Sequence, residues 1–228
     1  MKSGIAIADI FTGLYAANAV QAALIRRART NAGAHIDCAL LDTQVSVLGY
    51  QAMNYFVSGK EPQRLGNGHP NIVPYDVFPA RDGDITIACG NDGQFRKLAT
   101  ALGAPQLADD RRFARNRDRV VNRAAATAAL SVLTRQLDRA QLLPLLEAAG
   151  VPAGPINTTA QVFADPQVAA RNMRMQIANL RAKSGTTPGL RSGILIDGLA
   201  TAAALPAPAL GEHTAEVLAD SNWGGQPV

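Results

Sequence analysis

Asp9 is the first residue of this 228-residue sequence whose type and position could do chemistry. The apolar run before it is typical of a short strand, and a long helical pattern follows it. An acid between a strand and a helix lies where free backbone N–H groups and the helix dipole stabilise negative charge. A reactive carboxylate would be placed there. An ordinary helix cap has the same spacing, and spacing alone favours the cap.

A second candidate site is the loop of Gly90, Asn91, Asp92, Gly93 and Gln94. Two glycines between a predicted strand and a predicted helix can let the backbone pass close to a ligand, or let a lid move. The loop matches neither GxGxxG nor the P-loop, so it makes no strong case for a bound nucleotide. An ordinary strand-to-helix turn is the alternative interpretation.

The other reactive side chains form no recognisable centre. His35, His69 and His213 are widely separated and lack metal-ligand spacing, so we expect no metal site. Cys38 and Cys89 lie in separate apolar runs without a CxxC pair, which is typical of a protein of the reducing cytoplasm. No GxSxG elbow or HExxH pair is present.

Composition indicates a globular protein with a real core, because 47% of the residues are hydrophobic and 18% are charged. The net charge is +4, with arginines gathered at 26–29 and 111–123. No nucleic-acid-binding motif accompanies them, so an anionic small molecule is the favoured partner and nucleic acid is not expected. No run approaches the roughly 18 apolar residues of a membrane span, so no membrane association is expected.

Residues 1–58 show a strand–helix–strand–helix pattern, which contains Asp9. Strands are predicted before Asp9 and at 35–41, with helices from Asp9 to about residue 30 and from 42 to 57. This is a βαβ pattern, which implies parallel strands. Small and apolar residues recur at helical spacing in the first helix and are expected to be buried: Gly13, Ala16, Ala17, Val20, Ala23 and Leu24.

A linker rich in glycine and proline is predicted at 59–74, and a second set of elements follows it. We predict strands at 75–78 and 84–89 around a turn at 81–83, a helix at 95–102, two or three helices within 109–149, and an extended segment at 151–156. One short helix within 160–173 and a strand at 175–180 come next. Residues 184–208 are expected to be irregular, and a last helix begins at 211–214.

Taken together, these segments resemble class III (CaiB/BaiF-type) CoA-transferases, the relatives of carnitine dehydratase and 2-methylacyl-CoA racemase. Each matching piece is short, but all occur in order over nearly the whole chain. The pieces are GIAIAD at 4–9 with Thr12 and Gly13; AAL at 22–24 with Arg26; TNAG at 30–33; ID at 36–37 through LD at 41–42; GNGHP at 66–70; PY at 74–75; DG at 82–83; GNDGQF at 90–95; NR at 116–117 and 122–123; GVPAGP at 150–155; DPQ at 165–167 with Arg171; and AP at 207–208 with LGEHT at 210–214.

The resemblance places Asp9 on the family's catalytic aspartate and Gly90–Gln94 on its glycine-rich loop, which covers the reacting centre. It implies an α/β fold with a partial Rossmann-like large domain, a small α+β domain and an interlocked homodimer. On that template, residues 1–58 and 176–228 belong to the large domain, 59–74 to the linker and 75–165 to the small domain. It also implies a CoA thioester as substrate, with no permanently bound cofactor, and carboxylic acids as partners.

The family has a long N-terminal segment before the strand that carries its aspartate, and this sequence begins almost at that strand. We therefore expect either a complementing N-terminal polypeptide or a dimer formed through the chain's own surfaces, or an inactive chain. Two alternatives to CoA transfer stay open: a 2-methylacyl-CoA racemase-like isomerase, and a non-catalytic fragment or subunit. Racemases of the superfamily carry a glutamate near the position of Asp92, whereas the amino-acid sequence of the loop is more similar to that of the transferases.

Overall fold

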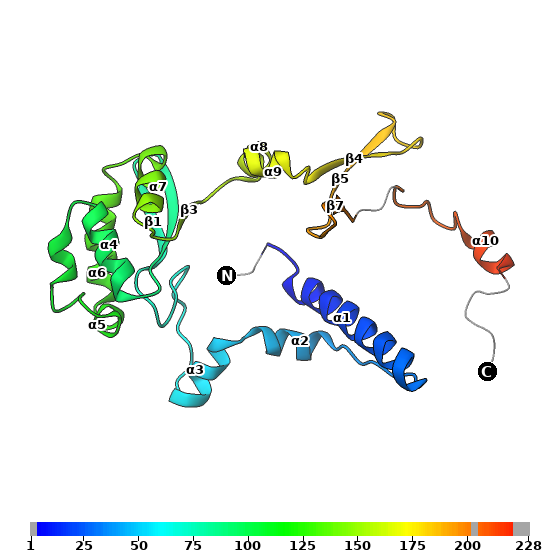
Figure 1. Cartoon of the computed structure of the whole chain (residues 1–228), viewed down its shortest axis with the longest axis horizontal. Helices are drawn as coiled ribbons and strands as arrows, with labels where there is room; N and C mark the ends of the chain where they lie inside the picture. Colours follow the sequence, from blue (N-terminus) through cyan, green and yellow to red (C-terminus); the bar gives the residue numbers. More distant parts are fainter. Residues whose placement is uncertain (1–3, 202–204, 221–228) are drawn as a thin grey trace. The chain divides into compact units, whose positions relative to one another are not determined.

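A computed structural model describes residues 4–201 and 205–220 of the chain (Figure 1). It forms two compact units, Met1–Gly66 and Asn67–Val228. The described residues combine helices with antiparallel sheets, in agreement with the predicted mixture of helix and sheet. The boundary between the units falls inside the predicted linker at 59–74, whereas the large-domain and small-domain boundaries stay a prediction.

The described part of the first unit is helical, with α1 (Ile7–Thr30), α2 (Leu40–Val47) and α3 (Tyr50–Ser58). The long helix predicted after Asp9 is present, and it packs against α2. It ends at Asn31, which takes the left-handed conformation at φ 53°. The single helix predicted at 42–57 is divided in two, because Gly49 at φ 49° interrupts it.

The two strands predicted in the first unit are not formed, which corrects the βαβ prediction. Residues 1–3 lie outside the described residues, residues 4–6 are irregular, and α1 already begins at Ile7. Residues 31–39 belong to no helix or strand. A parallel strand forms only where neighbouring strands take up its N–H and C=O groups. No strand within the described residues of this unit pairs with these segments.

The buried stripe predicted for α1 is also absent. No residue of α1 is buried, and Thr43 is the one buried residue among those described in the first unit. Large apolar side chains are instead exposed along all three helices. They include Ile10, Phe11, Leu14, Ile25, Leu41, Met53, Phe56 and Val57.

The second unit has its core on an antiparallel sheet of β1 (Tyr75–Ala80), β2 (Gly83–Ala88) and β3 (Ala153–Pro155), with β2 in the centre. The predicted hairpin is confirmed, because β1 pairs with β2 from Tyr75 opposite Ala88 to Ala80 opposite Gly83. Ile85 and Ile87 are fully buried on one face of β2, as period-two alternation requires.

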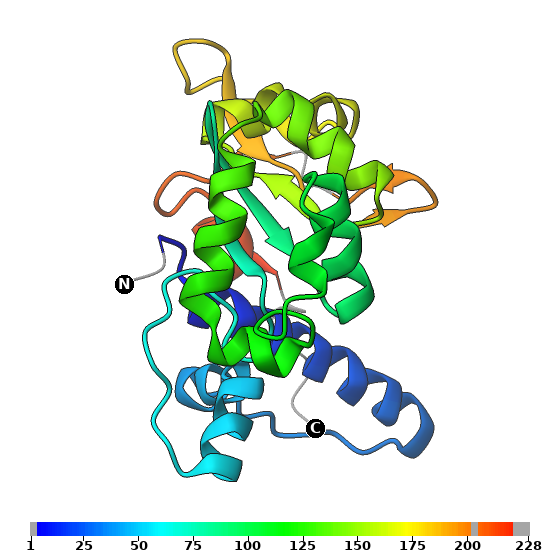
Figure 2. The same ribbon diagram turned by 90° about the vertical axis from the view of Figure 1, so that its left-hand side faces the viewer.

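Helices α4 (Asp92–Ala101), α5 (Asn116–Val121), α6 (Arg123–Thr134) and α7 (Arg139–Ala148), with the 3-10 turn η1 (Pro105–Ala108), complete this core. Figures 1 and 2 show α4, α6 and α7 around the hairpin. The two or three helices predicted within 109–149 are confirmed as α5 to α7. The largest apolar side chains of the core are Phe78, Ile85, Ile87, Phe95, Leu98, Phe113, Leu130, Leu142 and Leu146.

The rest of the second unit consists of shorter elements. The single helix predicted within 160–173 is two, α8 (Thr159–Ala164) and α9 (Pro166–Ala170), because Asp165 caps a new helix whose first residue is Pro166. The predicted strand at 175–180 is β4 (Arg174–Ala178), paired with β5 (Thr186–Leu190). Short strands β6 (Leu195–Ile196) and β7 (Leu199–Ala200) and helix α10 (Thr214–Ala219) follow. Residues 184–208 are thus more regular than predicted, although 202–204 lie outside the described residues.

Candidate active site

Asp9 lies in the first turn of the 24-residue helix α1, and not at the end of a strand. The N-cap of α1 is Ala6, whose side chain makes no capping hydrogen bond. The carboxylate of Asp9 is exposed and has no hydrogen-bond or ion-pair partner among the described residues. The ordinary capping interpretation therefore does not describe this acid. It lies in the first turn, where the backbone N–H groups have no partner within the helix.

The loop of Gly90 to Gln94 joins β2 to α4 and is held by its own side chains. Asn91 is the N-cap of α4, and its Oδ1 accepts a hydrogen bond from the backbone N–H of Gln94 at 2.9 Å. In return, Gln94 Oε1 accepts from the backbone N–H of Gly90 at 2.7 Å. This reciprocal pair explains why α4 begins at Asp92, three residues before the predicted start.

Position 93 suits a glycine, because little space is left between it and the side chain that caps the helix. A Cβ atom at Gly93 would lie 3.2 Å from Asn91 Oδ1, the oxygen that caps the helix. A side chain at this position would therefore push against the capping group. Gly90 has more room, with Gln94 Oε1 as the nearest neighbour of a built Cβ, at 3.5 Å.

Asp92 is held from outside the loop. Its Oδ1 accepts hydrogen bonds from Arg119 Nη2 and from the backbone N–H of Asn116, both at 2.8 Å. The Asp92 side chain is 52% exposed, whereas that of Arg119 is completely buried. Sequence analysis missed Arg119 and Asn116 as parts of the site. Arg119 lies in an arginine-rich run that has the pattern of a solvated surface, and no charge pattern distinguishes it from its neighbours.

Asp9 and the loop belong to different compact units, Asp9 to the first and Gly90–Gln94 to the second.

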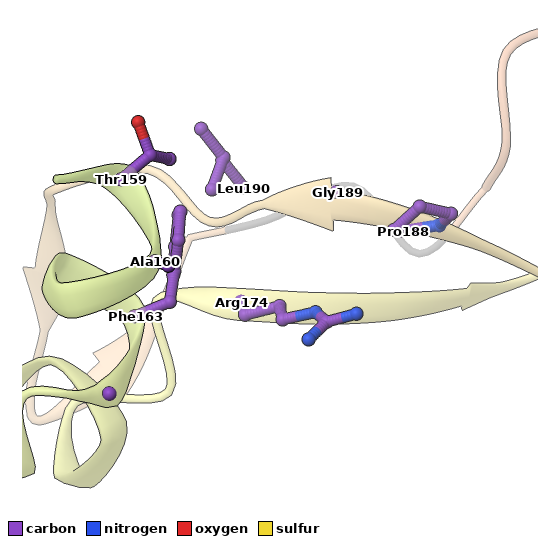
Figure 3. A pocket seen from close by; sticks show the side chains of 8 residues that line it. Thr159, Ala160, Phe163, Arg174, Pro188, Gly189 and Leu190 are labelled. Carbon is purple, nitrogen blue, oxygen red and sulfur yellow. The ribbon is translucent and has the colours of Figure 1, made fainter.

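One pocket in the second unit is lined by residues outside the predicted loop. It has a volume of about 650 Å³ and lies between α8 and the β4–β5 hairpin (Figure 3). Its lining is mostly apolar, with one cation, Arg174. The lining residues are Thr159, Ala160, Phe163, Ala164, Arg174, Pro188, Gly189 and Leu190.

Neither cysteine is paired, and the two differ in exposure. Cys89 is buried at the end of the hairpin, and burial raises the pKa of its thiol to about 12, an effect that the charge of Arg119 only partly opposes. Such a thiol is inert at neutral pH. Within the described residues, no group of three or more His, Cys, Asp or Glu side chains could hold a metal ion. None of the described helices is both long and apolar enough to cross a membrane.

Comparison with known proteins identifies the class. The model of CoA-transferase family III matches residues 1–214, so the chain belongs to that family. It is 49% identical to the succinate–glutarate CoA-transferase of Agrobacterium fabrum over 96% of this chain and 54% of that protein. It is 37% identical to the human succinyl-CoA:glutarate CoA-transferase, over 96% of this chain and 49% of that enzyme.

A solved structure agrees with this assignment. The crystal structure of a CaiB/BaiF family protein from Brucella suis is 52% identical, with a TM-score of 0.73 over 96% of this chain and 56% of that one. The predicted family and α/β fold class are therefore confirmed, whereas the interlocked homodimer stays a prediction. The chain spans about half the length of the curated relatives that it matches.

Proposed function

We propose that this chain carries the catalytic aspartate and the loop of an enzyme that moves CoA from an acyl-CoA thioester to a carboxylic acid. Asp9 is the nucleophile, and the Gly90–Gln94 loop shields the reacting centre. The observation that carries the proposal is the carboxylate of Asp9, which is exposed in the first turn of a long helix, has no partner among the residues that the structure describes, and belongs to a chain of this family.

The chemistry balances without water. A carboxylate oxygen of Asp9 attacks the thioester carbonyl, the C–S bond breaks, and CoA leaves as a thiolate from a mixed anhydride. The thiolate then attacks the Asp9 side-chain carbonyl, which releases the first acid and forms an aspartyl-CoA thioester. The acceptor carboxylate attacks that thioester, giving a second anhydride and the thiolate. Attack of the thiolate on the acceptor carbonyl forms the new acyl-CoA and restores the Asp9 carboxylate.

The anhydride and thioester intermediates hydrolyse if water reaches them, so a covering loop is needed. The exposed residues Gly90, Asn91, Asp92 and Gly93 on a firmly capped helix suit that role. Backbone N–H groups at a helix start can also stabilise the oxyanions that develop at each attack.

We also propose that activity requires the rest of the family fold, supplied in the same polypeptide or by a complementing one, in a dimer. The exposed apolar side chains along α1, α2 and α3 support this, because helices of a folded domain normally bury such a face. The curated relatives are about twice as long as this chain.

Replacement of Asp9 in the complete enzyme tests the proposed role. Asp9→Asn should lower CoA transfer by about a thousandfold or more, because the carboxylate nucleophile is lost. Succinyl-CoA with glutarate is the first pair to assay, since these acids appear in the names of the relatives. Asp42→Asn is the matched control, because Asp42 is an exposed aspartate in the first turn of α2. Normal turnover by Asp9→Asn would overturn the proposal.

A further inference from the structure

We propose that Arg119 is a positioning residue for the Gly90–Gln94 loop, and that Asp92 is the point at which the loop is anchored and not a group that transfers protons. This inference rests on the proposed function, in which the loop covers the reaction at Asp9. It assigns a role to a buried arginine on α5 and excludes a catalytic role for the carboxylate within the loop.

The guanidinium of Arg119 is fixed in three directions. Its Nε donates to the backbone carbonyl of Val73 at 2.5 Å, Nη1 donates to that of Phe113 at 2.7 Å, and Nη2 donates to Asp92 Oδ1 at 2.8 Å. The Phe95 ring lies against the face of the guanidinium, with 4.3 Å between Arg119 Cζ and the ring centroid. Because the planar fork is engaged on every side and excluded from solvent, it holds Asp92 at a defined place.

Asn116 extends this anchor to the segment before β1. Its backbone N–H donates to Asp92 Oδ1, its side-chain Oδ1 accepts from the backbone N–H of Val73 at 3.0 Å, and its Nδ2 donates to the Asn71 carbonyl at 2.8 Å. Residues 71–73, the start of α5 and the loop thus form one hydrogen-bonded network. The loop is thus tied to the core through Asp92, and Gly90 and Asn91 are held by their hydrogen bonds with Gln94.

The same bonds argue against proton transfer by Asp92. Its Oδ1 already accepts from two donors, one of which is a fully buried cation. Proton transfer at this oxygen would require one of these two hydrogen bonds to break, which costs free energy. In the racemase alternative, a glutamate lies near the position of Asp92. In this chain, Asp92 accepts hydrogen bonds from Arg119 and Asn116.

The test compares variants of the complete enzyme by the ratio of acyl-CoA hydrolysis to CoA transfer. Asp92→Ala and Arg119→Met release the loop, so water should reach the intermediates and the ratio should rise about tenfold or more, the size expected for losing a buried hydrogen-bond partner. Asp92→Asn keeps an acceptor oxygen, and transfer should fall by no more than about fivefold. Arg96→Met is the matched control, since Arg96 forms an exposed pair with Asp109 at 3.0 Å and should leave the ratio unchanged.

Hydrogen exchange of the 228-residue chain separates this inference from the proposed function. Exchange of the amides of Gly90 to Gln94 should quicken in Asp92→Ala and Arg119→Met but not in Asp92→Asn, whatever the chemistry at Asp9. If Arg119→Met does not fold, Asp92→Ala still provides the test, because Asp92 is half exposed. The inference is overturned if Asp92→Asn abolishes transfer as fully as Asp92→Ala with the loop still protected, or if Asp92→Ala changes neither ratio nor exchange.

Discussion

The two compact units of this chain carry similar hydrophobic patterns but bury them to different extents. In the second unit, Phe78, Ile85 and Leu98 have no exposed surface, and helices and strands pack around one core. In the first, Phe11 and Leu14 of α1 are 40% and 55% exposed. A periodic pattern therefore fixes which face of a helix is apolar, whereas burial of that face depends on whether the chain supplies a partner for it.

The candidate acids show the same contrast. Asp9 in the first unit and Asp92 in the second both lie in the first turn of a helix. Asp92 is bonded to a buried arginine, whereas Asp9 has no partner among the described residues. The carboxylate of the second unit thus has partners within its own unit, whereas that of the first unit is exposed, as the proposed nucleophile needs to be.

Replacement of one phenylalanine in each unit should show the difference between the two units most strongly. Phe78→Ala should lower the free energy of unfolding of the second unit by about 3–5 kcal/mol, because it removes a fully buried ring and leaves a cavity. Phe11→Ala in α1 should change stability by no more than about 0.5 kcal/mol. Hydrogen exchange of the 228-residue chain in urea reports each unit separately. A large effect of Phe11→Ala would show that α1 buries its apolar face in solution.

The two cysteines offer a second comparison. Cys38 in the first unit is partly exposed, whereas Cys89 in the second is buried with a pKa of about 12. At pH 8 a thiol reagent should modify Cys89 about a thousandfold more slowly than an ordinary thiol of pKa about 8.5, because its thiolate is scarce. Peptide mapping by mass spectrometry measures both rates, and comparable labelling of the two thiols in the folded chain would contradict the burial of Cys89.

The raised pKa of Cys89 also predicts a pH dependence of stability. The folded chain keeps the thiol proton up to about pH 12, whereas the unfolded chain releases it above about pH 8.5. The stability contributed by this group is thus complete below pH 8.5 and falls as the pH rises toward 12. Cys89→Ala should unfold with a smaller alkaline dependence than the unaltered chain in urea titrations from pH 8 to pH 10.

The cap of α4 should show the smallest of these effects. Asn91→Ala removes the side-chain oxygen that accepts from the Gln94 N–H, and should cost about 1 kcal/mol. Asn91→Asp keeps an acceptor and should cost much less. Urea unfolding of the second unit measures both. Equal losses in the two variants would mean that Asn91 contributes through something other than its cap.

Local patterns predicted the second unit well because its interactions are close in sequence. The hairpin follows from alternating apolar residues around the Arg81–Gly83 turn, and α4 follows from an amphipathic run behind the loop. The strands predicted before Asp9 and at 35–41 failed because strand formation depends on neighbouring strands, which the described residues of this unit do not provide.

The candidate site was predictable only in part. Residue type, spacing and family resemblance predict Asp9 and the Gly90–Gln94 loop as site residues, and their roles stay a prediction. Arg119 was not predicted, because burial of one arginine among several is decided by tertiary packing around Val73, Phe95 and Phe113, which sequence spacing does not encode.

Direct detection of the covalent intermediate tests the central claim, that Asp9 is the nucleophile of CoA transfer. The complete enzyme would be incubated with acyl-CoA, quenched with hydroxylamine and digested, and the carboxylates would be examined by mass spectrometry. We predict a hydroxamate at Asp9, absent from Asp9→Asn and absent from the peptide that contains Asp92. A hydroxamate at another carboxylate, with Asp9 unmodified during turnover, would contradict the account.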